Sequence, residues 1–227
     1  MPLTYLRDKL ALIMKTSIIR ALFITFEGGE GSGKSLQARA LYRKLNRLSI
    51  PAVLIHEPGS TPLGEKLGRL LKQRKDTVIS PESELLLFNA ARAELVNEII
   101  LPSLKNGQIV VCDRYADSTL AYQGYGRGLK LATVQAANDL ATGKLKPDLT
   151  LLLDIPVREG LARKHRSDND RFESEEIYFH ERVRKGYLSI ARKEPQRFMI
   201  IDARQDKRTI SQIIWKRVSD ILSKQKK

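Results

Sequence analysis

The feature that most constrains this chain is a glycine-rich segment that directly follows a short apolar run. Residues 22–26 read LFITF, and residues 28–35 then read GGEGSGKS, which fits the pattern GxxxxGKS. LFITF alternates in the manner of a strand. After the segment, apolar residues recur at helical spacing, at Ala38, Leu41, Leu45 and Leu48. Strand, loop and helix thus come in the order that a phosphate-binding loop requires, which a chance match of glycines would not reproduce.

The residue types of this loop suit a nucleotide. Its glycines permit a tight turn with backbone N–H groups pointing inward, and the helix that begins near Lys34 adds its positive end. Lys34 would reach the β- and γ-phosphates, and the Ser35 hydroxyl would ligate Mg²⁺. We expect the whole loop to hold the nucleotide, through Gly28, Gly29, Glu30, Gly31, Ser32, Gly33, Lys34 and Ser35.

Short apolar runs alternate with longer helical patterns along the chain. The runs cover residues 22–26, 52–55, 109–112, 149–153 and 199–201. Near-continuous apolar strands separated by helices predict a parallel sheet covered on both faces, with ligands at the carboxyl ends of the strands. The expected fold class is therefore α/β, a P-loop NTPase-type parallel five-stranded sheet with helices on both faces.

One helix is expected to begin at Ser80. Ser80-Pro81-Glu82 supplies an N-cap, a proline at the first helical position and an acid in the first turn. Pro102 should kink or restart this helix, and Gly107 should end it. The apolar residues along it are Leu86, Ala90, Ala93, Val96 and Ile100.

Composition sets wider limits. With 227 residues, 42% of them apolar and 29% charged, the chain resembles ordinary soluble globular proteins. We expect an extension over residues 1–19, with Met14 as an alternative translation start, and one domain over residues 20–227. No stretch is long enough to cross a membrane. The single cysteine, Cys112, excludes an internal disulfide and is expected to be buried, which favours a cytoplasmic setting.

The chain is strongly basic. Forty Lys and Arg residues against 26 Asp and Glu give a net charge of +14. This excess fits either nucleic-acid binding or a pocket for several phosphates, and charge alone leaves both open. The basic residues are spread widely, with local concentrations at 163–166, 182–185 and 224–227.

Charged residues also follow the predicted strands. Asp113 comes after the third run, where an acid beside a phosphate loop can hold the Mg²⁺ shell, and Arg114 can clamp a second phosphate. The plainer alternative is a helix-capping Asp paired with an Arg. Asp154, after the fourth run, is a rival for the metal and is expected to cap the next helix instead.

A basic segment lies between Arg158 and Arg171. It includes Arg163, Lys164, His165 and Arg166, interleaved with acids. It is either a solvated loop or a mobile lid that neutralises charge in a phosphoryl-transfer transition state.

From residue 20 onward, the chain resembles the thymidylate kinase family. FEGGEGSGKS resembles the family's phosphate loop, HEPGSTPLGE its EPGGT segment and LLFNAARAELV its substrate helix. VVCDRYADSTLAYQG resembles its DRY segment, and LTLLLDIPVREGLAR its fourth strand leading to a lid. The resemblance implies a nucleoside monophosphate kinase-like fold with a lid at about 158–172, ATP and dTMP as substrates, Mg²⁺ as cofactor and a homodimer, with neither nucleic acid nor membrane as a partner.

The resemblance also implies residue roles. Phe88 would stack on thymine, Arg92 would hydrogen-bond the base, Arg114 would grip the dTMP phosphate and Glu30 would meet the deoxyribose 3′-hydroxyl. The other dTMP contacts would come from Glu57, Pro58, Ser118, Thr119 and Gln123. A bacterial subtype of the family has a basic lid instead of a loop arginine, and this chain resembles it. The implied catalytic residues are Lys34, Arg114, Arg163 and Arg166, with Ser35 and Asp113 at the metal.

The chain departs from the family pattern at three positions. His56 stands where the family usually has Arg, Ser60 where it has Gly, and Gly68 where it has the Arg of GExxR. Arg69 follows Gly68, but one residue along a helix turns a side chain by about 100°. The phosphate or lid contacts of those arginines are therefore not carried over.

Two alternatives remain open from the sequence. Another nucleotide or nucleoside kinase of the same fold would share the loop. A P-loop ATPase or GTPase switch that binds nucleic acid or a protein would also share it and would explain the charge, although the chain has no NKxD segment for guanine. Adenine contacts are assigned only by position, to residues 203–206 after the last run.

Overall fold

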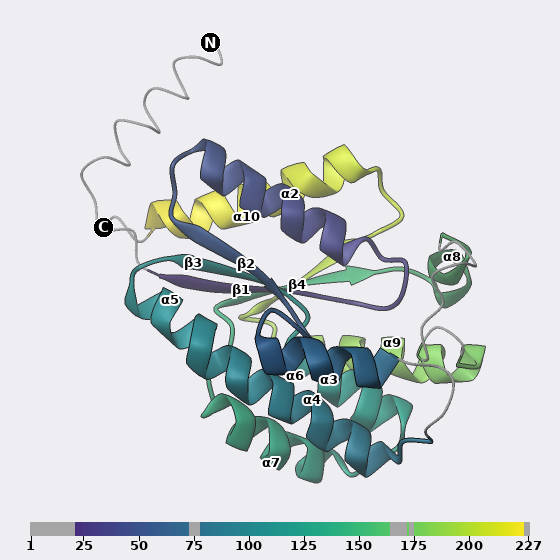
Figure 1. Ribbon diagram of the computed structural model, residues 1–227. Helices are drawn as coiled ribbons and strands as arrows, with labels where there is room; N and C mark the ends of the chain where they lie inside the picture. The colour runs from purple at the N-terminus through teal and green to yellow at the C-terminus, as the bar shows by residue number, and fades with distance from the viewer. Residues whose placement is uncertain (1–20, 73–77, 164–171, 173–174, 225–227) are drawn as a thin grey trace.

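A parallel five-stranded sheet forms the centre of the computed structural model, which describes residues 21–72, 78–163, 172 and 175–224 (Figure 1). The strand order is β2-β3-β1-β4-β5, with all neighbours parallel. The strands are β1 (Leu22–Glu27), β2 (Ala52–His56), β3 (Ile109–Asp113), β4 (Leu149–Asp154) and β5 (Phe198–Asp202). Each apolar run therefore forms a strand, and the predicted α/β fold is confirmed.

Every strand continues one residue beyond the carboxyl end of its apolar run, and that residue is polar. The five residues are Glu27, His56, Asp113, Asp154 and Asp202. Parallel strands bring their carboxyl ends to one edge of the sheet, so this edge collects polar groups and is suited to binding a ligand.

Helices cover both faces of the sheet (Figure 1). One face carries α2 (Lys34–Arg47) and α10 (Lys207–Lys224). Below the sheet in Figure 1 lie α3 (Pro62–Lys72), α4 (Pro81–Leu95), η1 (Val96–Ile100), α5 (Leu101–Lys105), α6 (Ala116–Thr119), η2 (Leu120–Gly126), α7 (Leu131–Thr142) and α9 (Ile177–Lys193). The short α8 (Val157–Ala162) follows β4 beyond the carboxyl edge. Within the described ranges, no helix combines the length and apolar character that a membrane span needs.

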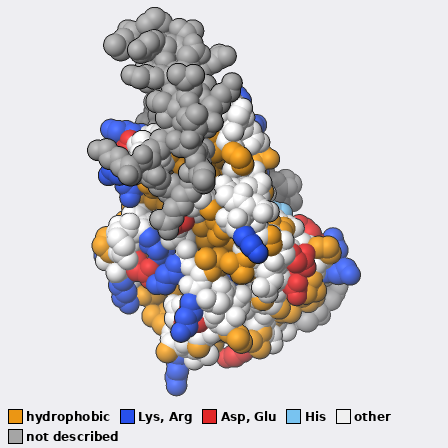
Figure 2. Space-filling view, turned by 90° about the vertical axis from the view of Figure 1, so that its left-hand side faces the viewer, with side chains coloured by type: hydrophobic (Ala, Val, Ile, Leu, Met, Phe, Trp, Pro, Cys, Tyr) orange, Lys and Arg blue, Asp and Glu red, His pale blue; other side chains and the backbone are white. Residues whose placement is uncertain are grey.

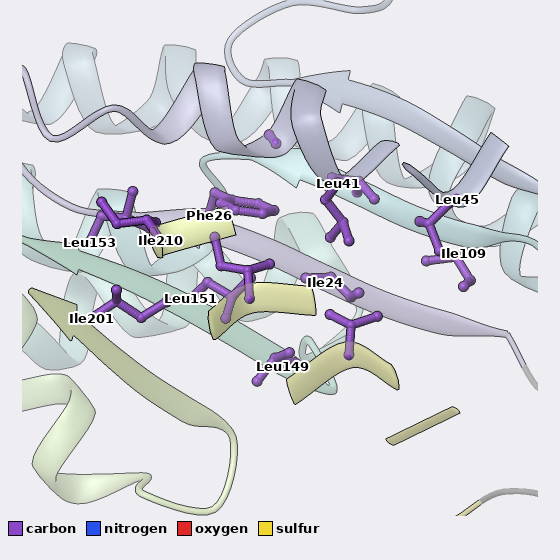
Figure 3. Close-up of a cluster of buried hydrophobic side chains, with 14 of the residues drawn as sticks. Ile24, Phe26, Leu41, Leu45, Ile109, Leu149, Leu151, Leu153, Ile201 and Ile210 are labelled. Carbon is purple, nitrogen blue, oxygen red and sulfur yellow. The ribbon is translucent and has the colours of Figure 1, made fainter. Parts of the chain in front are cut away.

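Alternation along β1 divides its side chains between the two layers. Ile24 and Phe26 pack with α2 and α10, in a cluster that includes Leu41 and Ile210 (Figure 3). Phe23 points to the opposite face and packs edge-on against Tyr115, 4.9 Å between ring centroids. Burying a side chain of this size stabilises the fold by about 1.5–3 kcal/mol. By the same alternation Glu27 lies on the Phe23 face, at the carboxyl edge.

The helix predicted from Ser80 is confirmed at both ends. The Ser80 side chain accepts a hydrogen bond from the Ser83 N–H, and Pro81 is the first helical residue. The helical path continues from α4 through the π-helical η1 into α5, of which Pro102 is the second residue. Gly107 then adopts a φ of 73° and closes a Schellman motif, with its N–H on the Leu104 carbonyl.

Two expectations about single residues have different outcomes. Cys112 is buried, as expected, and its thiol donates to the Arg114 carbonyl. The expectation that Asp154 caps the next helix is wrong. The N-cap of α8 is Pro156, and the Asp154 carboxylate instead pairs with Arg184 of α9 at 2.7 and 2.8 Å. A bidentate arginine supplies two charge-assisted hydrogen bonds, more than one helix cap offers.

Candidate active site

A cavity of about 710 Å³ lies at the carboxyl edge of the sheet. It brings together most of the predicted site residues, namely Glu30, Gly31, Gly33, Lys34, Ser35, Glu57, Pro58, Phe88, Arg92, Asp113, Arg114, Ser118, Thr119, Gln123 and Arg163. Gly28, Gly29 and Ser32 belong to the same loop without lining the cavity. Arg166 and most of the proposed lid lie outside the described residues.

The phosphate loop has the backbone that its glycines predict. Gly28, Gly31 and Gly33 have φ values of 138°, 67° and 88°, which glycine adopts without strain. A β-carbon on Gly28 or Gly31 would collide with backbone carbonyls of the chain at and after β4. Helix α2 then begins at Lys34 with no acidic side chain in its first turn. The first N–H groups of a helix have no partner within the helix, and no carboxylate of the first turn competes for them here. The start of α2 is therefore suited to binding an anion.

Lys34 is a nearly buried cation in this loop. Its side chain is 6% exposed, and Nζ donates to the Gly29 carbonyl at 2.7 Å. Burial, and after it the charge of Arg114, lowers the pKa of Lys34 to about 8. A phosphate oxygen would stabilise the charged ammonium far better than a carbonyl does. We therefore expect Lys34 Nζ to exchange the Gly29 carbonyl for a phosphate oxygen when an anionic ligand binds.

Arg114 links the end of β3 to the phosphate loop. Its φ of 73° is left-handed, which costs a non-glycine residue about 1–3 kcal/mol. Its N–H donates to the Phe26 carbonyl at 3.0 Å, which holds the turn. The guanidinium reaches Glu30 Oε1 at 2.6 Å and the Gly28 carbonyl at 3.3 Å. The backbone conformation thus aims a cation at the loop, where a second phosphate would lie.

The sequence patterns missed a buried carboxylate that supports Arg114. Glu27 is fully buried and accepts from the Tyr115 N–H at 2.7 Å, the Ser118 hydroxyl at 2.6 Å and the Tyr187 hydroxyl at 2.8 Å. Tyr187 and Ser118 in turn accept from Arg114 Nη1, at 3.3 and 3.4 Å. Burial, and then Asp117, raises the pKa of Glu27 to about 7. In the sequence, the alternation along β1 was the one signal that Glu27 would point toward the site. No sequence pattern singled out Tyr187.

Aromatic side chains form another part of the cavity wall. Phe88 of α4 lies 5.8 Å from Phe172, between ring centroids, and Tyr122 lies 6.0 Å from Phe172. All three line the cavity. The Tyr122 hydroxyl donates to Glu30 Oε1 at 2.6 Å and accepts from Arg114. Flat apolar faces next to a phosphate loop suit a planar base, which gains from offset or edge-on ring contacts.

Arg92 lines the cavity but is almost completely buried, at 1% exposed. Its Nε donates to Glu57 at 2.8 Å. Its other bonds reach Thr119 and Asn138, at 2.7 and 2.8 Å, and, at 3.3 Å, Asn89 and the Tyr115 carbonyl. These bonds occupy the fork of donors that a guanidinium offers. For Arg92 to contact a base directly, one of these partners must give way.

Ser35, Asp113 and Glu57 offer oxygen ligands of the kind that Mg²⁺ prefers. All three line the cavity, and Glu57 N–H donates to the Asp113 carbonyl at 3.0 Å. Glu57 Oε1 is buried without a hydrogen-bond partner among the described residues, while burial raises the pKa of its carboxyl. The described part of the chain holds no cluster of three or more His, Cys, Asp or Glu side chains. The set therefore fits an ion held largely by phosphate and water rather than by a protein cage.

Arg163 is the described end of the proposed basic lid. It lines the cavity, and its Nη1 donates to the Ala203 carbonyl at 2.8 Å. Ala203 begins the loop 203–206, to which position in the chain assigns the adenine contacts. The hydrogen bond joins that loop to the described end of the proposed lid.

The three departures from the family pattern have local structural consequences. The His56 ring contacts the Ser60 hydroxyl at 3.0 Å and Glu65 Oε1 at 3.5 Å. Ser60 has a φ of 64°, which explains why glycine suits this position. A β-carbon on Gly68 would lie 3.0 Å from the Pro58 carbonyl, so α3 packs closely on the turn. Arg69 is exposed on the outside of the same helix.

Comparison with known proteins relates this geometry to one family. The sequence model of thymidylate kinase matches residues 26–214. The thymidylate kinase of Dehalococcoides mccartyi (strain ATCC BAA-2266 / KCTC 15142 / 195) is 54% identical over 202 residues, 89% of this chain and 98% of that protein. The thymidylate kinase of Roseiflexus sp. (strain RS-1) is 47% identical over 198 residues, 82% of this chain and 88% of that protein. A crystal structure of thymidylate kinase from Ehrlichia chaffeensis superposes with a TM-score of 0.67 at 38% identity, covering 80% of this chain and 92% of the other.

Proposed function

Because the chain belongs to the thymidylate kinase family, we propose that it phosphorylates dTMP to dTDP, with ATP as the phosphoryl donor and Mg²⁺ as the cofactor. The observation that carries the proposal is that one cavity joins the phosphate loop, the strained Arg114 and an aromatic wall. A nucleotide acceptor would lay its base along Phe88 and direct its phosphate toward Arg114. The acceptor phosphate would then face the loop that holds the donor.

The reaction asks little covalent chemistry of the protein. A phosphate monoester has a second pKa of about 6, so the dTMP phosphate is mostly a dianion at neutral pH and needs no general base. The protein's part is to align two anions and neutralise their charge. Lys34 and the loop N–H groups would hold the donor, and Arg114 the acceptor. Ser35 and Asp113 would hold the Mg²⁺ shell, and the ion would offset charge on the donor phosphates.

The same proposal assigns the nucleoside contacts. Phe88 would stack on thymine, and Gln123 and Thr119 would lie at the base. Arg92 would reach the base by giving up one of its present hydrogen bonds. The shortest of these bonds joins Arg92 to the Thr119 hydroxyl, at 2.7 Å. Glu30 would meet the sugar by releasing its bonds to Arg114 and Tyr122. Glu57, Pro58 and Ser118 would complete the acceptor site.

A substrate panel tests this proposal against the alternatives. A coupled assay of ADP release with dTMP, dUMP, thymidine, CMP and AMP should give the highest kcat/KM with dTMP. A clear preference for another acceptor would favour a different nucleotide kinase of the same fold. ATP hydrolysis independent of dTMP would favour an ATPase switch. On the face shown in Figure 2, Lys and Arg side chains gather toward the left, with Asp and Glu side chains between and beside them.

We also propose that the protein is a homodimer and that it acts in the cytoplasm as one domain over residues 20–227. Large apolar side chains are exposed on α3 and along the α4–α5 path, at Leu63, Leu70, Leu86 and Leu101. Because α3 and α4 pack against each other, these side chains belong to neighbouring surfaces. Such a surface suits a second copy of the chain. The cytoplasmic setting rests on the single buried cysteine, Cys112.

A further inference from the structure

A buried carboxylate lies behind the part of the cavity where Gln123 is found. Glu84 precedes Phe88 by four residues on α4, and Arg92 follows four residues later, so the three share one face of the helix. Glu84 is 0% exposed and Gln123 is 1% exposed. Gln123 Nε2 donates to Glu84 Oε1 at 2.6 Å. Of this pair, Gln123 lines the cavity.

Arg127 determines which role Glu84 plays in that hydrogen bond. Arg127 Nε donates to Glu84 Oε1 at 3.3 Å, and Nη2 donates to Oε2 at 3.2 Å. A guanidinium has no acceptor, so both carboxylate oxygens must accept. Glu175 Oε1 holds the remaining Arg127 nitrogen, Nη1, at 2.6 Å. Glu84 is thus fixed as an acceptor, and only the NH₂ end of the Gln123 amide can face it.

The orientation of the Gln123 amide follows from this constraint. An amide has a donor end and an acceptor end. Either end of the Gln123 amide could face a ligand if the group on its other side could both donate and accept a hydrogen bond. With the NH₂ group bound to Glu84, the carbonyl Oε1 is the end left for the cavity. A base that presents an N–H on its pairing edge matches this oxygen. A base that presents a ring nitrogen lone pair there does not.

We propose that Glu84 is a positioning residue that sets pyrimidine specificity, by fixing Gln123 so that its Oε1 accepts the ring imide N–H of thymine and rejects cytosine. This inference rests on the proposed function, because it takes dTMP as the acceptor. Thymine and uracil carry a hydrogen on N3, whereas neutral cytosine carries a lone pair there. Cytosine would leave a buried acceptor facing another acceptor, which is the kind of mismatch that polar sites reject strongly.

The test compares kcat/KM for dTMP and dCMP in the wild type and in Glu84→Gln. The wild type should prefer dTMP by about 10³-fold or more. In Glu84→Gln, the new amide can face Gln123 with either end, so Gln123 can turn over and offer NH₂ to cytosine. The dTMP-to-dCMP ratio should fall at least about 10-fold, through a lower KM for dCMP and a higher KM for dTMP, while kcat for dTMP changes less.

Glu175→Gln is the matched control, because it removes the other carboxylate on Arg127 without touching Gln123. It should keep the ratio within about threefold of wild type. Gln123→Met is a second variant, which keeps an unbranched chain but removes the acceptor, and its ratio should also fall. A folded Glu84→Gln that keeps the wild-type ratio, or loses both substrates equally, would overturn the inference. So would an unchanged ratio in Gln123→Met, should Glu84→Gln fail to fold.

A failure of the proposed function would give a different result from a failure of this inference. A wild-type protein that forms no dTDP would refute the kinase assignment itself. Thermal stabilisation by dTMP and by dCMP then tests the amide orientation without turnover. Stabilisation by dTMP alone in the wild type, and by both nucleotides in Glu84→Gln, supports the inference. Equal stabilisation in the wild type contradicts it.

Discussion

At the scale of single residues, the proposed acceptor side of the cavity depends on Glu27, which hydrogen-bonds residues next to those expected to touch the phosphate. Its carboxylate holds the Tyr115 N–H and the hydroxyls of Ser118 and Tyr187. The hydrogen bond to Tyr115 is adjacent to the left-handed Arg114 and helps to keep that strained conformation. A group of this kind positions a cation without contacting the substrate.

The raised pKa of Glu27 predicts a pH effect on stability. Burial and Asp117 raise this pKa from 4.5 to about 7, so between these values the folded protein binds more protons than the unfolded chain. Glu27 therefore lowers the free energy of unfolding as pH rises through this window. Relative to Glu27→Gln, the wild type should lose stability between about pH 5 and pH 8 in urea denaturation. Parallel stability curves for the two proteins would contradict this prediction.

Lys34 gives the second prediction at this scale. Lys34→Ala should lower kcat by about 10³-fold or more, because in the proposed reaction the ammonium would neutralise charge on the transferred phosphoryl group. The fold should persist, since Lys34 packs in a loop and donates to the backbone rather than to core side chains. Steady-state kinetics measure the loss, and circular dichroism checks the fold. Turnover within a few-fold of wild type would contradict the phosphate-loop assignment.

At the scale of elements, α4 shows how one helix serves both the core and the site. Glu84, Leu85, Arg92 and Leu95 are buried, whereas Leu86 is 64% exposed. The apolar residues singled out along its sequence therefore do not share one buried face. Charged residues can occupy the buried face because Arg127 and Glu57 supply their partners. Hydrophobic periodicity alone cannot find such a face.

A second point at this scale concerns the basic segment after α8, which we expect to act in catalysis. The phosphate loop offers Glu30 where another subtype of the family offers Arg, so the cation over the transferring group should come from Arg163 or Arg166. Replacing both with Met should lower kcat by about 10³-fold with a much smaller change in KM for dTMP. Steady-state kinetics with both substrates measure this. A raised KM with unchanged kcat would mean that these residues bind the ground state, and Arg158 or Arg171 would become the candidates.

At the scale of the whole molecule, the carboxyl edge of the sheet holds the candidate site, and large apolar side chains are exposed on α3 and the α4–α5 path. Leu86→Glu should place a charge in the proposed dimer interface and shift the protein to monomers. Light scattering after size exclusion measures the mass. Leu140→Glu is the matched control, since Leu140 is 88% exposed on α7 and should leave the dimer intact. A monomeric wild type would contradict the dimer proposal.

The sequence by itself determined the local parts of this protein. Strand, glycine loop and helix follow one another within a few residues, so the phosphate loop could be predicted from the spacing of its residues. The five strands could be predicted from short apolar runs. The cap at Ser80 and the left-handed Gly107 were predictable for the same reason, because each depends on neighbours in the chain. The loop residues, Asp113 and Arg114 followed from motifs at strand ends, which parallel pairing brings to one edge. The roles of Phe88, Arg92 and the other dTMP contacts followed only from the family resemblance.

Only the tertiary structure decided which distant groups meet. Glu27 and Tyr187 are 160 residues apart, and Asp154 met Arg184 rather than a helix end because α9 packs beside β4. Arg92 and Glu84 look like surface residues in the sequence, and their burial depends on partners from other elements. The physical reason is that a buried charge is tolerable only where the fold supplies its hydrogen bonds, and those partners follow no local period.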